Sequence, residues 1–411
     1  MSDIYAGIDL GTDSIKIIVC EKINQKYHVL ACTSSPSAGI INGFVSDMKS
    51  AVSSCKNAVR EASEALGTRI TKVVASVPPE NCTMDIVSGE ADVLDYNNIS
   101  GTDISNVLQD ALKDINFEEE ELVTVMPINF NIDDETSVHD PKGLKGSKLS
   151  ARVVVSTTPK EPLYRLLEVL KLAGLETVDI CYSSFGDYYC MKDKKNDEVV
   201  GAVINIGEDA TNISIFNRGI QIKHGMIPIG SKNVDKDLTY VYKCKLSDSR
   251  ILKEKFALAM ASYADANEEW ELVIDKDEKK VVNQLAVSKV VEARVRELLS
   301  VSKNEIKNLT NREIRYIIIT GGLSELAGFQ YLVEQEFGFV AKICNLTTMG
   351  IRHNKYSSCY GILKYFNDKL DLRGKAYNMF SEDDVEKMKK VDASEITNNI
   401  QDKVFGHYFN D

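Results

Sequence analysis

The first residues alternate between apolar, strand-like runs and one amphipathic helix. Residues 4–20 are apolar and β-branched on both sides of a turn at Gly11, and a second run covers residues 27–33. Together these runs predict a β-hairpin. Between residues 47 and 66 the apolar positions recur at helical spacing, and Gly67 stands where a helix ends.

The pattern changes between residues 81 and 156, after a continuous apolar strand at 70–77. Short strand-like runs in this segment surround an acidic helix at 103–115. The runs cover residues 83–88, 123–132 and 151–155. This pattern predicts a small α+β insertion, after which a helix at 160–175 and another strand return the chain to the first unit.

The second half of the chain repeats the layout of the first. Residues 199–216 form a strand, a glycine-containing turn and a strand, as residues 4–20 do. A charged helical stretch at 235–309 follows, with a candidate hairpin at 270–282. A last strand at 314–320 precedes Gly321-Gly322, which we expect to open a helix at 324–332. The repeat predicts an internal duplication, and ligands of such αβ proteins bind in the cleft between the halves.

The last residues of the sequence fall into two segments of different composition. Residues 367–392 are charged and predict a linker. Beyond them, apolar side chains fall at helical spacing at Ile396, Ile400, Val404, Phe405, Tyr408 and Phe409. Such a helix packs either on its own protein or on a membrane. Its few basic residues are offset by acidic ones, so membrane binding would depend on apolar burial.

Composition narrows the classes of function. With 411 residues the chain exceeds the size of a single core, and a net charge of −12 argues against nucleic-acid binding. The nine cysteines and five histidines are scattered, which argues against a disulfide framework or a zinc site. The N-terminal residues show no signal-peptide pattern and no run could span a bilayer, so we expect a cytoplasmic protein.

Three glycine turns carry the candidate chemistry. In the first, Gly11 lets the backbone approach a phosphate and Lys16 supplies a donor, while Asp9 would face Mg²⁺ or its waters. Taken alone, this run is equally typical of a hairpin. The second turn spans residues 204–212 and the third spans 319–324. Three such turns in this order are far more specific than any one of them.

The three turns resemble the first phosphate, second phosphate and adenosine motifs of the actin, heat-shock chaperone and sugar-kinase superfamily. Other segments resemble the bacterial cell-division family FtsA. Residues 39–47 are similar to its G-x-x-x-G-x-V-x-D run. Residues 125–127 and 140–146 are similar to its V-x-P … P-x-G-L-x-G element, and Ser247-Asp248 … Lys253 resembles its adenosine-side helix. The resemblance covers residues 5–365 and the tail.

This resemblance implies an α/β, actin-like two-lobe fold of ribonuclease H-like duplicated domains, with an inserted α+β subdomain 1C. The implied subdomains are 1A (1–80 and 159–195), 1C (81–158), 2A (196–234 and 310–366), 2B (235–309), a linker (367–392) and a C-terminal amphipathic helix (393–411). The implied ligands are ATP and Mg²⁺.

The resemblance also implies roles for single residues. Contacts to the phosphates fall on Gly11, Thr12, Ser14 and Lys16. Asp9 would hold the Mg²⁺ shell, and Gly207 would close over the phosphates. Gly230 would belong to a further turn that faces the nucleotide. The adenosine falls to Lys253, Gly321, Gly322 and Leu323.

The second turn departs from the family pattern D-I-G-G-G-[ST]. Asn205 replaces the acid, Glu208 and Asp209 replace two glycines, and Ala210 replaces the hydroxyl residue. Asparagine brings no charge to organise Mg²⁺, and two carboxylates near a triphosphate repel it unless they turn away. We therefore expect weakened or altered ATP binding and at most slow hydrolysis.

The function implied by the resemblance is that of an ATP-binding, cytoskeletal cell-division protein. It would polymerise, bind the C-terminal tail of FtsZ through residues 235–309, and hold the division ring on the inner face of the cell membrane. Its membrane contacts would be made by Ile400, Val404, Phe405, Tyr408 and Phe409. Two alternatives are a PilM-like scaffold of pilus assembly, which should lack the membrane tail, and a small-molecule kinase, for which no carboxylate base is evident.

Overall fold

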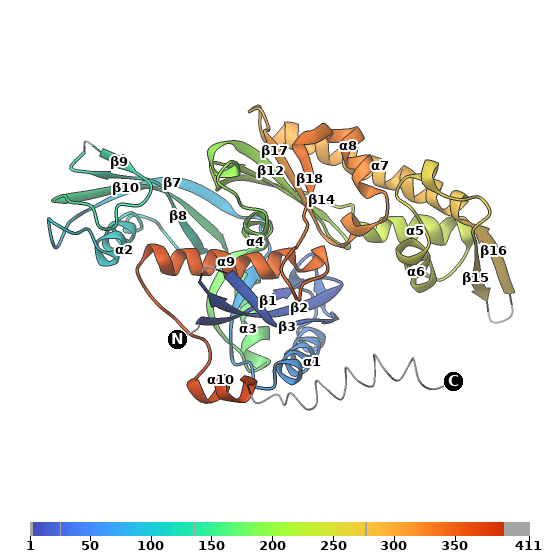
Figure 1. The fold of residues 1–411 in the computed structure, drawn as a ribbon, viewed down its shortest axis with the longest axis horizontal. Helices are drawn as coiled ribbons and strands as arrows, with labels where there is room; N and C mark the ends of the chain where they lie inside the picture. The colour runs from blue at the N-terminus through green and yellow to red at the C-terminus, as the bar shows by residue number, and fades with distance from the viewer. Residues whose placement is uncertain (1–2, 25, 135, 276–277, 390–411) are drawn as a thin grey trace.

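The computed structural model describes residues 3–24, 26–134, 136–275 and 278–389, and it shows two αβ lobes with a smaller unit beside the first (Figure 1). The N-terminal lobe contains a five-stranded sheet in the order β11-β6-β1-β2-β3. Its strands are β1 Asp3–Leu10, β2 Ser14–Ile23, β3 Lys26–Pro36, β6 Lys72–Val77 and β11 Glu176–Tyr182. Strands β1, β2 and β3 run antiparallel, whereas β6 pairs parallel with β1.

Helices cover both faces of this sheet. They are α1 Met48–Leu66 and α3 Lys160–Leu172, which pack together, and α4 Ser183–Cys190 and α9 Ser357–Leu372, which form a second pair. Helix α1 starts and ends where the sequence predicts. The Asp47 side chain accepts a hydrogen bond from the Ser50 amide, and Gly67 adopts φ 78° at the C-terminus.

The second lobe repeats this plan with the sheet order β14-β13-β12-β17-β18. Its strands are β12 Val200–Ile206, β13 Thr211–Asn217, β14 Ile220–Ile227, β17 Tyr316–Thr320 and β18 Ala341–Ile343. As in the first lobe, three antiparallel strands are followed by a parallel pairing, here of β12 with β17. The shared pattern is what an internal duplication produces.

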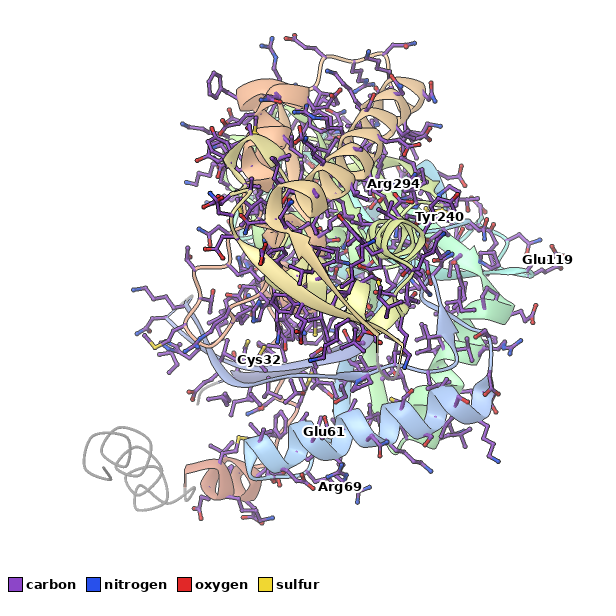
Figure 2. The ribbon with its side chains drawn as sticks, turned by 90° about the vertical axis from the view of Figure 1, so that its right-hand side faces the viewer. Cys32, Glu61, Arg69, Glu119, Tyr240 and Arg294 are labelled. Atoms are coloured by element: carbon purple, nitrogen blue, oxygen red, sulfur yellow. The ribbon has the colours of Figure 1, made fainter. Side chains whose placement is uncertain are left out.

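The remaining elements of the second lobe flank this sheet and extend to the hairpin of β15 and β16 at its outer end (Figure 1). They are α5 Ser231–Tyr242, α6 Leu246–Lys255, the hairpin β15 Glu269–Asp275 and β16 Glu278–Asn283, α7 Gln284–Leu309 and α8 Phe329–Phe337. In Figure 2, Tyr240 and Arg294 of this lobe lie above Glu61 and Arg69, which mark α1 and the loop after it.

The insertion folds around its own core. Its antiparallel sheet has the order β7-β10-β8-β9, with α2 Gly101–Asp110 packed on β7 and β10. The strands are β7 Thr83–Asp92, β8 Glu120–Ile132, β9 Thr136–Val138 and β10 Lys148–Pro159. The helix starts at Gly101, because Ser100 and Asp103 form a reciprocal cap, and it ends earlier than the predicted residue 115.

Helix α9 connects the first lobe to the insertion. Leu372, its last residue, packs against the core of the insertion. The Arg373 carbonyl lies so close to Gly101 that a Cβ there would be 2.0 Å away. Lys142 of the insertion donates a hydrogen bond to the Asp371 carbonyl (2.8 Å). One helix is therefore fixed at its C-terminal end by the insertion.

The prediction of a helix at residues 324–332 is wrong. Gly322–Glu325 form a single 3₁₀ turn, and α8 begins only at Phe329. The reason is Gly328, whose left-handed backbone (φ 82°) interrupts the helical run. The two glycines of the third turn therefore open a short turn rather than a helix.

The described part of the predicted linker is ordered structure. Helix α9 continues through Asn367 to Leu372, and α10 covers Glu382–Lys389. Between them Met379 and Phe380 are buried in the core of the first lobe, and the Met379 amide donates to the Ile4 carbonyl (3.2 Å). Two apolar side chains thus anchor a segment that is otherwise charged. The predicted tail helix at 393–411 lies outside the described residues, and none of the described helices is long and apolar enough to cross a membrane.

Candidate functional site

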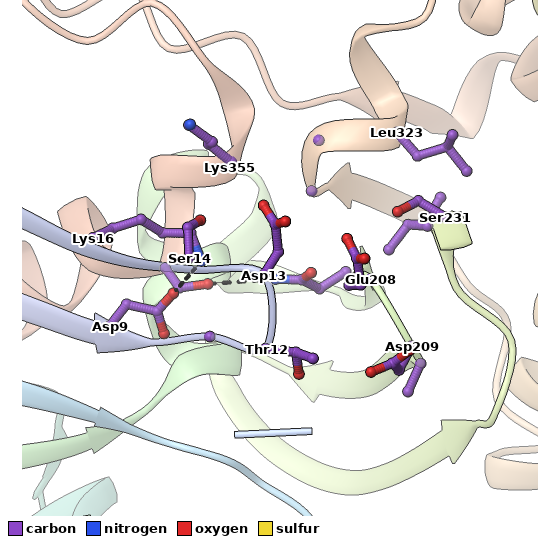
Figure 3. A pocket seen from close by; sticks show the side chains of 18 of the residues that line it. Asp9, Thr12, Asp13, Ser14, Lys16, Glu208, Asp209, Ser231, Leu323 and Lys355 are labelled. Carbon is purple, nitrogen blue, oxygen red and sulfur yellow. Dashed lines mark hydrogen bonds and ion pairs between the residues drawn. The ribbon is translucent and has the colours of Figure 1, made fainter. Parts of the chain in front are cut away.

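The three glycine turns line one cavity of about 570 Å³ between the lobes (Figure 3). The β1–β2 turn approaches it from the first lobe, while the β12–β13 turn and the 3₁₀ turn after β17 approach it from the second. Of the residues predicted to bind nucleotide, the lining includes Asp9, Gly11, Thr12, Ser14, Lys16, Asn205, Gly207, Lys253, Gly321, Gly322 and Leu323. Gly230 is not in this lining, although its neighbour Ser231 is.

In the first turn, Lys16 folds back over Gly11. Its Nζ lies 2.9 Å from Asp9 Oδ2, and a Cβ at position 11 would be only 2.6 Å from that nitrogen. Burial by itself would lower the pKa of the Lys16 ammonium, but the Asp9 carboxylate outweighs burial and raises it. The other Asp9 oxygen accepts a hydrogen bond from Ser76 (2.5 Å). A Cβ at position 11 would also lie 2.9 Å from the Ser14 carbonyl, a backbone atom that cannot swing away as the lysine can, so this turn favours glycine.

The two hydroxyls of the first turn differ in their availability. Thr12 Oγ1 accepts a hydrogen bond from the Asn42 amide (2.8 Å), at the tip of the small hairpin formed by β4 Ile40–Ile41 and β5 Phe44–Val45. Ser14 Oγ is buried and has no hydrogen-bond partner among the described residues. A buried polar atom without a partner is costly. Ser14 is therefore the hydroxyl that a bound group would satisfy.

The second turn caps the first turn of α5. The Gly207 amide donates to the Ala210 carbonyl (2.9 Å) and closes the turn. The Ser231 amide donates to the Gly207 carbonyl (2.9 Å) and thereby joins the turn to the helix. Gly230 matters at this junction, because a Cβ there would lie 2.3 Å from the Glu208 carbonyl. Its role is to allow this packing, one layer behind the cavity.

Cations neutralise the acidic side chains that replace glycines in the second turn. Asp209 pairs with Lys232 (3.2 Å), and Glu208 lies 3.8 Å from Arg250. Arg250, on α6 of the second lobe, also contacts Asp13 of the first turn (2.6 Å) and so bridges the lobes. Burial and the nearby Asp13 charge raise the pKa of the Glu208 carboxyl. Figure 3 shows Asp13 and Glu208 projecting into the same space.

Sequence reasoning missed Arg250. The only signal for it is its place on α6 one helical turn before Lys253, on the same side of the helix. Burial would raise the pKa of its partner Asp13, but the hydrogen bond and charge of Arg250 lower it overall. The ion pair is thus an electrostatic feature of the site that no glycine motif predicts.

Asn205 contacts a buried acid that sequence reasoning also missed. Asp187, on α4, accepts hydrogen bonds from Asn205 (2.6 Å) and from Ser357 and Ser358 of α9 (2.6 and 2.9 Å). Burial raises the pKa of the Asp187 carboxyl to about 6, and the three hydrogen bonds limit that rise. Its sequence signal is a single acid among the aromatic residues of a short helix.

The third turn depends on two different glycines. Gly321 has φ 92°, and a Cβ there would lie 2.2 Å from the Ile206 carbonyl at the end of β12. A Cβ added at Gly322 would have no atom within 4 Å, so the backbone of Gly322 is open to the cavity. Lys253 is buried in the cavity wall, where its Nζ donates to Asp235 (3.0 Å).

Comparison with known families identifies two matching regions. A model described as cell division protein FtsA matches residues 202–361, and a model of the SHS2 domain inserted in FtsA matches residues 80–157. The two FtsA models together cover more than half of the chain. The relatives include the FtsA of Bacillus subtilis (strain 168), 25% identical over 91% of this chain and 86% of that protein. The FtsA of Enterococcus faecalis is 26% identical over 90% and 84%.

Solved structures confirm the predicted fold class. The PilM–PilN type IV pilus biogenesis complex matches with a TM-score of 0.57, 14% identity and coverage of 88% of this chain and 98% of that one. MreB5 of Spiroplasma citri bound to ADP matches with a TM-score of 0.53, 11% identity and coverage of 90% and 98%. These likenesses establish an actin-like architecture, and the sequence matches establish the lineage within it: the chain belongs to the FtsA family of cell-division proteins.

Proposed function

We propose that this chain binds ATP or ADP with Mg²⁺ in the interlobe cavity. One observation carries the proposal: three glycine turns from both lobes line a single cavity of about 570 Å³. The residues present fit such a ligand. Ser14 offers a buried hydroxyl without a partner among the described residues, and the backbone at Gly322 leaves room for a flat base. MreB5, which shares the fold, is described as bound to ADP and to AMPPNP.

The residues divide by chemistry. The backbone at Gly11, the Ser14 hydroxyl and the Lys16 ammonium are donors suited to phosphate oxygens. Asp9, within 2.9 Å of Lys16, is placed to accept from the water shell of Mg²⁺. The opposite wall, at Gly321, Gly322 and Leu323, suits the adenosine. When bound, the nucleotide supplies contacts to both lobes and so favours the closed form.

Hydrolysis is proposed to be slow. Asn205 carries no charge, and the carboxylates of Glu208 and Asp209 are engaged with Arg250 and Lys232. None of these groups is free to polarise an attacking water. The ion pairs also remove much of the repulsion that two acids would exert on phosphates, which supports binding without rapid turnover.

At the cellular level we propose that the chain polymerises and tethers the FtsZ ring to the inner face of the cytoplasmic membrane at the division site. The FtsA family models and relatives support this role. The FtsZ tail is assigned to subdomain 2B, at residues 235–309, and the membrane to the tail at 393–411, beyond the described residues. A PilM-like role is disfavoured, because the inserted SHS2 module matches the FtsA model.

The test is titration calorimetry of Mg-ATP with the purified chain. We expect micromolar binding that Lys16→Ala weakens by on the order of tenfold or more, since the ammonium is a charged phosphate donor. Lys22→Ala is the matched control, because Lys22 lies on the same strand but pairs with Asp371 outside the cavity. Absence of binding at millimolar ATP would reject the nucleotide proposal. Failure to co-sediment with FtsZ would reject the tether.

A further inference from the structure

A buried acid fixes the orientation of the Asn205 amide. Asp187 is 1% exposed, and its Oδ1 accepts hydrogen bonds from Ser357 and Ser358. Its Oδ2 accepts from the Asn205 Nδ2 at 2.6 Å. Each oxygen of the carboxylate thus faces donors only. Because an ionised carboxylate accepts and never donates, it selects the NH₂ end of the neighbouring amide.

This selection determines what Asn205 presents to the cavity. Its Nδ2 is engaged by Asp187 and, at 3.3 Å, by the hydroxyl of Ser358. The amide oxygen therefore points away from the carboxylate. Asn205 itself lines the cavity, together with Asp9 of the opposite lobe. A neutral oxygen acceptor consequently faces the space where the first phosphate turn presents its own acid.

The geometry also joins the two lobes. Asp187 belongs to α4 and its serine donors to α9, both packed on the first lobe, whereas Asn205 is the penultimate residue of β12 in the second. Oxygen acceptors are the ligands that Mg²⁺ and its bound waters prefer. Groups that hydrogen-bond to such ligands orient them, and their removal weakens metal binding.

We propose that Asp187 is a positioning residue, which holds the Asn205 amide with its oxygen toward the cation of a bound Mg²⁺-nucleotide. A carboxylate from α4 thereby compensates for the one that is absent from the second turn. This inference rests on the nucleotide binding proposed above. It assigns Asp187 no contact with the ligand and no part in bond breaking.

The test compares ADP affinity with Mg²⁺ and with EDTA, measured by calorimetry on the full chain. In Asp187→Asn the new amide still accepts from the serines and turns its NH₂ toward Asn205. The Asn205 side chain must then reverse and present NH₂ to the cation. We expect the Mg²⁺-dependent gain in affinity to fall by on the order of tenfold, with the affinity in EDTA unchanged.

A second experiment exchanges Asp187 and Asn205 and tests the proposal by rescue. Asn205→Asp alone places two carboxylates in contact and should lower the thermal unfolding temperature. Asp187→Asn combined with Asn205→Asp restores a donor–acceptor pair and turns an oxygen to the cavity, so the Mg²⁺-dependent gain should return. Ser105→Ala is the matched control, since the Ser105 hydroxyl donates to the Gly101 carbonyl of α2 and lies outside the cavity, so the Mg²⁺-dependent gain should stay unchanged. If Asp187→Asn does not fold, Ser358→Ala replaces it, with a smaller loss expected.

The outcomes separate the two proposals. An unchanged Mg²⁺-dependent gain in Asp187→Asn, or in Ser358→Ala where that variant replaces it, overturns the positioning role while nucleotide binding stands. Equal losses with Mg²⁺ and with EDTA overturn it as well, because a merely structural role predicts them. If the unaltered chain binds no ADP in either condition, the nucleotide proposal fails and the inference falls with it.

Discussion

Gly321 and Gly322 are adjacent in sequence, but only Gly321 lacks space for a side chain. At Gly321 a side chain would combine a positive φ of 92° with a carbonyl 2.2 Å from its Cβ, whereas at Gly322 the same atom would meet open space. We expect Gly321→Ala to destabilise the chain by more than about 2 kcal/mol, because strain and overlap add. Gly322→Ala should stay within about 0.5 kcal/mol. Urea unfolding of both variants checks this, and equal losses would contradict it.

Glu80, at the entry to the insertion, is 8% exposed and forms no ion pair within the described part of the chain. Burial raises the pKa of its carboxyl from 4.5 to about 7. Because the folded-state pKa is the higher one, this group removes stability as pH rises from about 4.5 to 7, and the loss persists above that. Glu80→Gln should therefore stabilise the chain at pH 8, by on the order of 2 kcal/mol.

Thermal unfolding between pH 4 and pH 8 tests this prediction. The gain from Glu80→Gln should vanish near pH 4, where the carboxyl is protonated in both states. Exposed Glu176 provides the matched control, and Glu176→Gln should show no such pH-dependent gain. A constant difference at all pH values would indicate that charge is not the cause.

At the scale of elements, α6 brings Arg250 between two acids of opposite lobes. Its contacts with Asp13 (2.6 Å) and Glu208 (3.8 Å) neutralise carboxylates at the mouth of the cavity. Arg250→Ala leaves both charges facing the site proposed for phosphates. We expect Mg-ATP affinity to fall by on the order of tenfold, with partial recovery when Glu208→Gln is added. Arg296→Ala, on the surface of α7, is the control, and calorimetry is the measurement.

Local sequence patterns predicted most helices and strands but not the tertiary contacts between them. The strands around Gly11 and Gly207 and the cap of α1 follow from periodicity and turn residues, which act over a few positions. Asp187 and Arg250 escaped prediction because their partners lie far along the chain, at Ser358 and Asp13. The error at α8 came from reading Gly321-Gly322 without Gly328. Local signals determine where an element stops, whereas only tertiary packing determines which side chains share a site.

At the scale of the whole molecule, the segment after α9 packs its apolar side chains into the core of the first lobe. Phe380 is 7% exposed within that core, although it stands in a charged stretch. Phe380→Ala should therefore cost about 3 kcal/mol or more of unfolding free energy. Phe339 offers a matched control at 93% exposure, and its replacement by alanine should cost little. Denaturant unfolding monitored by circular dichroism compares them. If Phe380→Ala loses as little unfolding free energy as Phe339→Ala, the burial of Phe380 does not stabilise the first lobe.

The span of α9 has a mechanical consequence. Its first residues hydrogen-bond Asp187 behind the cavity wall, and its last residue is fixed against the insertion. A helix of 16 residues is about 24 Å long, so a change of about 5° in its direction displaces the far end by about 2 Å. The helix thus links the wall of the interlobe cavity, at Ser358, to the contact with Gly101. A tilt of α9 at its cavity end would therefore move its contact with Gly101 by a distance comparable to a side-chain contact.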